Sequence, residues 1–250
     1  MKNILILTSC INPNTNIFAV GSIEERTNDL VKNINFLINK EIFNLIYVID
    51  ASQEISFLEN TNLKNYLVEK GSKINENIKF LNFSINDSLK KEIKKKGKGF
   101  SEMKMLLKVL EEIKNKFNET VYIHKISGRY KIINIEYLIE KNYKILTTTN
   151  SKIILNQSHL FERTITNFYT FSSDLDLKVF YKVLEKVNDL FYKSFSVEKL
   201  FYSEIVMNVF IYSYRSRYLP KVDPNLKGGS TQGRLTRRRQ IIKNFIYKYL

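Results

Sequence analysis

The stretch VYIHKISGRYKI, residues 121–132, combines the pattern of a buried strand with features that such a strand rarely carries. Its short apolar run is typical of a strand covered on both faces. Lys125, Gly128 and Arg129 nevertheless follow within the same stretch. Cations are seldom left inside a protein without an anionic partner. The stretch therefore predicts either a carboxylate of the same chain beside these cations, or an anionic ligand to which the strand presents them.

The segments around this strand predict an α/β fold. Apolar runs at 3–8, 44–50 and 78–84 predict three further buried strands, and 24–40 and 100–117 have the apolar spacing of helices. Alternation of strands and helices favours a mostly parallel, GT-A-like or Rossmann-like mixed sheet with helices on both faces. The second half of the chain mixes strands and helices without regular alternation. It predicts a helix at 135–141, strands at 144–149, 152–156 and 164–172, helices near 174–193 and 196–214, and a terminal amphipathic helix at 236–250.

The charge is unevenly distributed along the chain. The net charge is +15, and residues 215–250 hold ten Lys or Arg against one acid, which gives +9 for that segment. We therefore expect one catalytic domain at 1–214 and a basic helical extension at 215–250 that packs on it or on an anionic membrane surface. A nucleic-acid-binding protein without catalysis is the alternative that this tail favours. The concentration of charge in one segment weighs against it.

The composition also limits the kinds of site. Cys10 is the single cysteine, so an internal disulfide and a thiolate zinc cluster are excluded. His124 and His159 are the two histidines, too few for a histidine-rich metal site. No apolar run reaches the roughly 18 residues of a membrane-spanning helix, and the N-terminal run is too short for a secretory signal. We expect a cytoplasmic protein, either free or peripheral on the inner membrane face.

Several polar residues lie at the ends of predicted strands or directly after them. They are Thr8 to Asn12, Asp50, and Ser127 to Tyr130. In open α/β sheets, ligands bind beyond the carboxyl ends of the strands. We therefore expect these three segments to meet at one edge of the sheet and to form a ligand site there.

The segment KKKGKGFSEMKML, residues 94–106, has two interpretations. Gly97 and Gly99 flank Lys98 before a helix, and such a turn lets the backbone approach a phosphate at the helix N-terminus. The alternative is a basic turn in which Ser101 caps the helix and Glu102 complements its dipole. The sequence leaves both open.

The polar residues of the central strand also have two interpretations. Lys125 and Arg129 could contact a diphosphate, with Gly128 permitting close approach and Tyr130 packing on a ring. Alternatively, Arg129 pairs with a structural carboxylate. His124 is expected to be a hydrogen-bonded core residue.

Two acidic motifs further along the chain are less specific. Asp174 and Asp176 have the spacing of a Mg²⁺ or Mn²⁺ site, but a cap on the following helix is favoured. Glu198 and Glu204 lie in an aromatic-rich segment and could be structural partners, bases or solvated residues.

Taken in order, these features resemble a group of small bacterial and viral sugar transferases with a GT-A-like fold. The segments that carry the resemblance are LTSCINP, GKGFSE, HKISGRYKI, TNFYTFSSDL and the late GGSTQG. Members of that kind build capsule, lipopolysaccharide or other surface glycans. The resemblance implies transfer of a sugar from a nucleotide-sugar donor to a hydroxyl of a glycan or glycolipid acceptor.

The resemblance also bears on metal dependence. In the common pattern of that group, a DXD motif ends a central strand and binds a metal on the donor diphosphate. Here the residues from Lys125 to Tyr130 stand in that place. Fixed cations can stabilise a leaving diphosphate instead of a metal. The implied enzyme therefore needs no cofactor, with Mg²⁺ or Mn²⁺ as the alternative.

Roles for single residues follow from the resemblance. Thr8 and Asp50 would hold the nucleoside, and Lys98, Gly99 and Glu102 would approach the donor sugar and phosphates. The residues expected to bind diphosphate or sugar are Lys125, Gly128, Arg129 and Tyr130.

A general base must also take the proton of the acceptor hydroxyl. Glu102 is the first candidate for this base, and Glu162 is the second.

Overall fold

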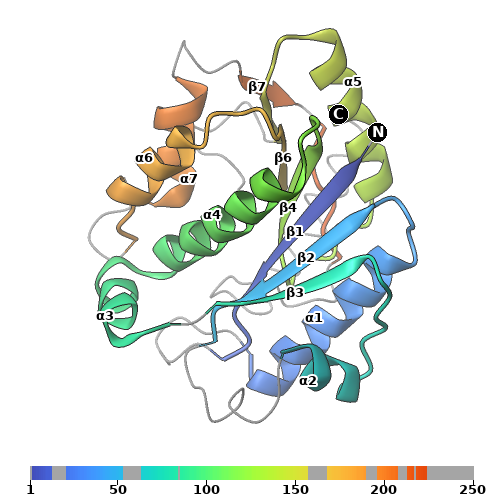
Figure 1. The fold of residues 1–250 in the computed structure, drawn as a ribbon, viewed down its shortest axis with the longest axis vertical. Coiled ribbons are helices and arrows are strands. Elements are labelled where there is room, and N and C mark those ends of the chain that lie inside the picture. Colours follow the sequence, from blue (N-terminus) through green and yellow to red (C-terminus); the bar gives the residue numbers. More distant parts are fainter. Residues whose placement is uncertain are drawn as a thin grey trace.

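The computed structural model describes residues 2–12, 21–52, 63–83, 85–156, 168–189, 196–207, 213–216 and 218–223. Within these ranges, seven strands form one sheet in the order β3-β2-β1-β4-β6-β5-β7 (Figure 1). Strands β1 to β4 are parallel to one another, and β6 runs antiparallel to both β4 and β5. The prediction of a mostly parallel mixed sheet is confirmed. The strands are β1 (Asn3–Ser9), β2 (Leu45–Asp50), β3 (Ile78–Asn82), β4 (Tyr122–Ser127), β5 (Ile153–Asn156), β6 (Phe168–Ser172) and β7 (Ser213–Ser216).

Helices cover both faces of this sheet (Figure 1). Helices α4 (Lys98–Lys116), α6 (Lys178–Lys186) and α7 (Val197–Phe201) pack on one face, with a π-helical turn, η3 (Tyr202–Val206), after α7. Helices α1 (Ile23–Ile38), α2 (Leu63–Glu69) and α5 (Ile135–Thr148) pack on the other. The short helix α3 (Asp87–Lys96) leads into α4.

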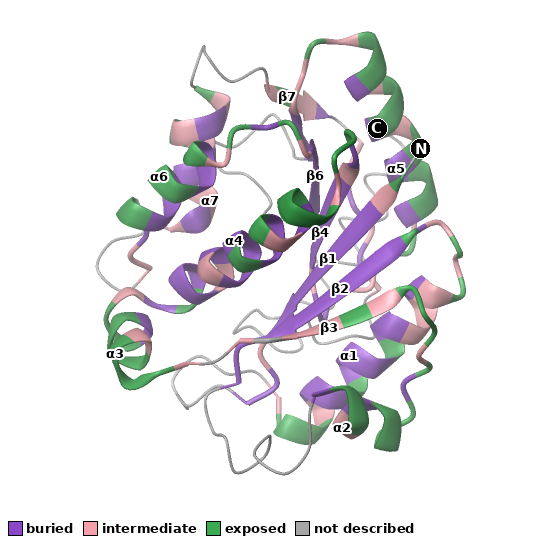
Figure 2. Ribbon diagram, viewed as in Figure 1, coloured by how far each residue is buried: buried purple, intermediate pink, exposed green. Residues whose placement is uncertain are grey.

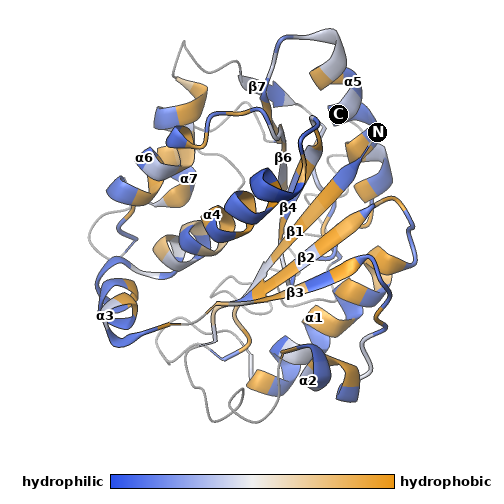
Figure 3. Ribbon diagram, in the orientation of Figure 1, coloured by the Kyte–Doolittle hydropathy of each residue, from blue (hydrophilic) through white to orange (hydrophobic). Residues whose placement is uncertain are grey.

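The two cores follow from the alternation of side chains along each strand. In β1, Ile4 and Ile6 point into the core beneath α4, while Leu5 and Leu7 point toward α1. All four are fully buried. Figure 2 shows β1 and β2 buried along their length, and Figure 3 shows the same strands as hydrophobic. Continuous apolar strands of this kind are typical of a sheet covered on both faces.

The strand order reverses between β1 and β4. The chain leaves β1 for β2 on one side, while β4 and β6 extend the sheet on the other. Connections on opposite sides of such a point leave a crevice beyond the carboxyl ends of the two strands, where ligands bind in open α/β sheets. This position corresponds to Ser9 on β1 and Ser127 on β4.

The predicted strand at 144–149 is wrong, because α5 continues to Thr148. Its buried side chains, Leu138, Asn142 and Leu146 among them, keep helical spacing through this region. The hydroxyl of Thr148 donates to the carbonyl oxygen of Lys144 at 2.7 Å, as threonine does within helices. A run of β-branched residues therefore favoured a strand where packing on the sheet selects a helix.

Two late helices were predicted too long. Helix α6 covers only residues 178–186 of the predicted 174–193. The predicted helix at 196–214 is helical at 197–206, but residues 213–216 form β7, parallel to β5. Pairing with β5 outweighs the local helical pattern, which the sequence alone does not reveal. The predicted boundary at 214 thus falls within β7, and the predicted terminal helix lies outside the described residues.

The predicted strands at 3–8, 44–50, 78–84 and 152–156 and the helices at 24–40 and 100–117 are confirmed to within two residues at each end. The predicted strand at 164–172 corresponds to β6 where the structure describes it. None of the helices in the described ranges is both long and apolar enough to cross a bilayer.

His124 is a buried, hydrogen-bonded residue, as predicted. Its Nδ1 lies 2.9 Å from Oγ1 of Thr170, and its Nε2 lies 3.4 Å from Oδ1 of Asn3. Oδ1 of Asn3 can only accept, so Nε2 donates to it and Nδ1 accepts from the hydroxyl of Thr170. The ring is therefore neutral, with its proton on Nε2. Burial lowers the pKa of His124 to about 3.

This histidine predicts an acid-sensitive stability. Unfolded His124 takes up a proton below about pH 6.5, while the folded ring stays neutral. The contribution of His124 to stability is therefore fully present above that pH, and it is lost as the pH drops toward the folded pKa of about 3. We expect the free energy of unfolding to fall by roughly 1.4 kcal/mol per pH unit from this group. Urea unfolding between about pH 7 and pH 4.5 should show a shallower slope for His124→Gln than for the wild type. Equal slopes would contradict the assignment.

Candidate active site

The pairing of β1 with β4 places three polar side chains on the face covered by α4. Thr8 aligns with Ser127, and Ile6 aligns with Lys125. Because alternate residues share a face, Lys125 and Ser127 both point to the side of Ile6 and Thr8. Ile6 belongs to the core beneath α4. The carboxyl ends of the two strands therefore present a lysine and two hydroxyls to α4.

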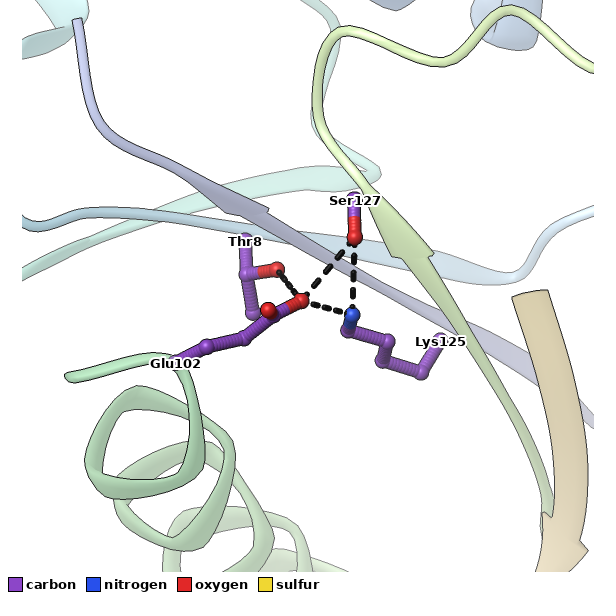
Figure 4. Close-up of polar contacts among 4 residues, drawn as sticks. All are labelled: Thr8, Glu102, Lys125 and Ser127. Atoms are coloured by element: carbon purple, nitrogen blue, oxygen red, sulfur yellow. Dashed lines mark hydrogen bonds and ion pairs between the residues drawn. The ribbon is translucent and has the colours of Figure 1, made fainter. Parts of the chain in front are cut away.

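Helix α4 supplies the acid that meets them (Figure 4). Oε1 of Glu102 accepts hydrogen bonds from Oγ of Ser127 at 2.9 Å and from Oγ1 of Thr8 at 3.3 Å. Nζ of Lys125 forms an ion pair with the same oxygen and donates to Oγ of Ser127 at 2.9 Å. We call Thr8, Glu102, Lys125 and Ser127 the Glu102 cluster. It joins three elements at the point where the strand order reverses.

The cluster keeps Glu102 ionised. Burial works to raise the pKa of its carboxyl, but the charges of Lys125 and Lys98 and the hydrogen bonds from Lys125 and Ser127 outweigh it. The pKa of Glu102 therefore lies below its usual range. A carboxylate with a lowered pKa is a weak acceptor of a substrate proton. The hydrogen bonds and charges that lower the pKa of Glu102 therefore weigh against its role as the general base.

Lys125 on the central strand pairs with a carboxylate of the same chain, which is the first of the two arrangements that the sequence predicts. Its side chain is only 1% exposed, and its ammonium lies 5.7 Å from the centre of the Tyr169 ring on β6. The cation thus has a carboxylate partner within the same chain and an aromatic ring beside it. Lys125 contributes to the site by fixing Glu102.

Gly99 lies in the first turn of α4 and is closely packed. Its N–H donates to Oδ2 of Asp189 at 2.6 Å. A Cβ at this position would lie 2.5 Å from Cγ2 of Val197 and 2.6 Å from the same carboxylate oxygen. The absence of a side chain thus lets the segments before and within α7 approach α4. Burial raises the pKa of Asp189, with Glu198 and Glu102 adding to the effect.

Helix α4 begins at Lys98, so the alternative in which Ser101 caps the helix is wrong. Gly97 occupies the cap position and contributes no side chain there. Ser101 lies inside the helix and is buried. Lys98 is exposed at the helix start, and its charge acts on the pKa values of Glu102, Tyr130 and Cys10. An exposed cation at a helix N-terminus is suited to bind phosphate.

Gly128 serves the contact between β4 and β1. Its N–H donates to the carbonyl oxygen of Thr8 at 2.6 Å. A Cβ would come within 3.0 Å of that oxygen and 3.1 Å of the side chains of Ser9 and Leu30. Nδ2 of Asn33 on α1 donates to the carbonyl oxygen of Gly128 at 2.7 Å. Gly128 thus has a packing role that is independent of any ligand.

Arg129 is buried, with 9% of its surface exposed. Burial lowers its pKa, the nearby charge of Arg26 lowers it further, and the carboxylate of Asp29 opposes both. Arg129 therefore lies among charged groups contributed by α1. Tyr130 is half-buried beside it, and burial raises the pKa of its hydroxyl.

Asp50 and Arg26 hold the backbone that follows β1. Oδ2 of Asp50 accepts from the N–H of Ile11 at 3.0 Å, and Oδ1 accepts from the N–H of Ser52 at 2.9 Å. Nε of Arg26 donates to the carbonyl oxygens of Cys10 and Ile11 at 3.0 and 2.9 Å. Burial raises the pKa of Cys10 to about 12, so its thiol is protonated at neutral pH. These contacts hold the backbone of the segments that follow β1 and β2, where the nucleoside is expected to bind.

The remaining predicted acids lie elsewhere or have other partners. Glu162 lies outside the described residues. Asp174 pairs with Lys152, and Glu204 pairs with Lys186. The cap expected from Asp174 is not found, because α6 begins at Lys178, and Oδ1 of Asp176 accepts the N–H of Lys178 at 3.0 Å. Among the described residues, no group of three or more His, Cys, Asp or Glu side chains is placed to hold a metal ion.

Sequence reasoning missed Asp189, Tyr169 and Arg26. Asp189 lies 90 positions from the glycine that it contacts. Tyr169 meets Lys125 only through the pairing of β6 with β4. The period-two spacing of Lys125 and Ser127 was the signal that could have revealed Ser127 as a member of the cluster.

No protein-family model and no curated protein matches this chain. Among solved structures, a candidate nucleotide-diphospho-sugar transferase from Desulfovibrio desulfuricans G20 has a TM-score of 0.51 at 8% identity, covering 98% of this chain and 96% of that one. A 4-diphosphocytidyl-2C-methyl-D-erythritol synthase from Anaerococcus prevotii DSM 20548 has a TM-score of 0.42 at 11% identity, covering 98% and 96%. A cytidylyltransferase from Leptospira borgpetersenii serovar Hardjo-bovis (strain JB197) has a TM-score of 0.43 at 12% identity, covering 89% and 81%. The first of these likenesses shows that the chain shares the fold of that transferase-like structure.

Proposed function

We propose that this chain is a transferase that uses a nucleotide-sugar donor and moves the sugar to a hydroxyl of a glycan or glycolipid acceptor. The observation that carries the proposal is the Glu102 cluster, a charged and hydrogen-bonded group at the carboxyl ends of β1 and β4. It occupies the position where open α/β sheets bind ligands. The fold shared with the Desulfovibrio protein supports a nucleotide-utilising enzyme by analogy.

In the proposed reaction, the acceptor oxygen forms a bond to the anomeric carbon of the donor. The bond from that carbon to the diphosphate breaks, and the nucleoside diphosphate leaves with the electron pair. Positive charge beside the diphosphate stabilises this departure. In this proposal Lys98, which is exposed at the start of α4, supplies that charge, and Arg129, which follows β4, adds to it. The acceptor proton passes to a base, for which Glu162 stays a prediction.

We further propose that the transfer is metal-independent. The positive charges of Lys98 and Arg129 can replace the charge of a metal at the diphosphate. Release of nucleoside diphosphate should therefore persist in EDTA. Activity that is lost in EDTA and restored by Mn²⁺ would contradict this part of the proposal. The assignment of the acceptor to capsule or lipopolysaccharide glycans rests on the sequence resemblance alone.

A thermal-shift panel tests the proposed donor class. The panel contains the diphosphates of uridine, guanosine, cytidine and deoxythymidine, their common nucleotide-sugars, and a generic oligonucleotide. We expect one nucleotide family to raise the melting temperature, because a ligand that binds only the folded state stabilises it. A response to the oligonucleotide alone, falling steeply with salt, would favour the nucleic-acid alternative. No response to any nucleotide would contradict the proposed function.

A further inference from the structure

The two oxygens of Glu102 have different surroundings. Oε1 accepts from Thr8, Ser127 and Lys125. Across the described ranges, no hydrogen-bond donor reaches Oε2, and Figure 4 shows dashed lines at one oxygen only. The side chain of Glu102 keeps 18% of its surface exposed. One oxygen is thus saturated by the protein, while the other receives no hydrogen bond from the part of the chain that the structure describes.

An ionised carboxylate can accept about four hydrogen bonds over its two oxygens. The ion pair with Lys125 and the hydrogen bond from Ser127 hold Glu102 in this acceptor-only form and lower its pKa. A group that binds at Oε2 must therefore be a donor and must not be anionic. Phosphate oxygens are excluded by charge, while a sugar hydroxyl meets both conditions. Hydrogen bonds from a neutral donor to a charged acceptor are among the stronger ones.

The position of Glu102 along α4 fits the same chemistry. Lys98 and Glu102 are four residues apart, so their side chains lie on the same face of the helix. A phosphate held at Lys98 brings the sugars joined to it within one helical turn of Glu102. The Lys125 ion pair holds the carboxylate in a fixed orientation.

Resting on the proposed function, we infer that Oε2 of Glu102 is a recognition site for a sugar hydroxyl of the donor. The hydroxyl belongs to the transferred sugar or to the ribose. Glu102 then contributes to donor affinity and sugar selectivity, and proton abstraction is left to another group. A base would act mainly on kcat, whereas a recognition residue of this kind raises the donor KM when it is changed.

Fluorinated donors test the inference on the wild-type protein. The probes are UDP-glucose, UDP-galactose and GDP-mannose, each with the hydroxyls of the sugar replaced by fluorine in turn. Matched donors carry deoxyribose. Fluorine can accept but not donate, so one analogue should bind roughly tenfold more weakly, or worse, by calorimetry. A loss confined to a fluorinated sugar identifies the transferred sugar, and a loss confined to deoxyribose identifies the ribose.

Two protein variants are tested with the same donors. In Glu102→Gln the difference between the parent donor and the weakened analogue should disappear, with the change in KM larger than that in kcat. Glu112→Gln is the matched control, because Glu112 lies on the same helix and pairs with a strand lysine, Lys79, away from the cluster. That control should keep the difference.

The outcomes separate the inference from the proposed function. If nucleotide-sugars bind but every analogue binds as well as its parent, the inference is wrong and the donor class stands. The inference is equally wrong if Glu102→Gln keeps the full difference. If neither nucleoside diphosphates nor nucleotide-sugars bind, the proposed function fails and the inference fails with it.

Discussion

Replacing Lys125 with methionine should lower the free energy of unfolding by about 3–5 kcal/mol. Methionine keeps most of the length of the lysine side chain but leaves the Glu102 carboxylate without its cation. Lys125 is 1% exposed, so water does not replace the lost charge. Urea unfolding of the single variant measures the loss directly.

A second substitution and a matched control make this prediction specific. In the double variant Lys125→Met with Glu102→Leu, most of the lost stability should return, because the unpaired charge is gone. Lys79→Met removes a lysine that pairs with Glu112 on the same helix, but that lysine side chain is 45% exposed. It should cost less than about 1 kcal/mol. A single variant as stable as the wild type, or a double variant no better than the single one, would contradict the role assigned to the ion pair.

Gly99→Ala should destabilise the protein, although alanine normally stabilises a helix relative to glycine by about 1 kcal/mol. The new Cβ would lie 2.5 Å from Cγ2 of Val197 and 2.6 Å from Oδ2 of Asp189. Neither contact is tolerated without movement of α7 or of the segment before it. We expect a net loss of about 1–3 kcal/mol, as for other overpacked sites.

A second substitution, at Val197, should restore part of the stability that Gly99→Ala loses. Val197→Ala in the same chain removes the methyl group at 2.5 Å and should recover part of the loss. Val197→Ala alone should be destabilising, because Val197 is buried. Melting temperatures of the three variants measure this coupling. A Gly99→Ala variant more stable than the wild type would show that the close packing at α4 is wrong.

Much of the fold was predictable because strong patterns and tertiary packing agree. The apolar runs of β1, β2 and β4 are too continuous for any element but a doubly covered strand. Helix α4 was recognisable from seven apolar residues in phase. The local pattern predicts a strand at Thr147 to Thr149, where packing selects a helix, and a helix up to residue 214, where pairing with β5 selects a strand.

The site was predictable in part, for a physical reason. The sequence indicated Thr8, Glu102 and Lys125, because each lies within or at the end of a strongly patterned segment. It did not reveal that Glu102 and Lys125 pair with each other. That pairing depends on the register of β1 with β4 and on the placement of α4 over both. The contact of Asp189 with Gly99 lies outside the reach of local pattern for the same reason.

We propose that the carboxyl ends of β1 and β4 bind the donor diphosphate beside the start of α4. Isothermal titration calorimetry of Lys98→Ala tests it most directly, because Lys98 is exposed and its removal leaves the fold intact. Lys91→Ala, an exposed lysine on α3, is the control of equal charge. For the nucleoside diphosphate that responds in the panel, Lys98→Ala should bind roughly tenfold more weakly than the wild type, with Lys91→Ala unchanged. Equal affinity in all three proteins would contradict a diphosphate site at the start of α4.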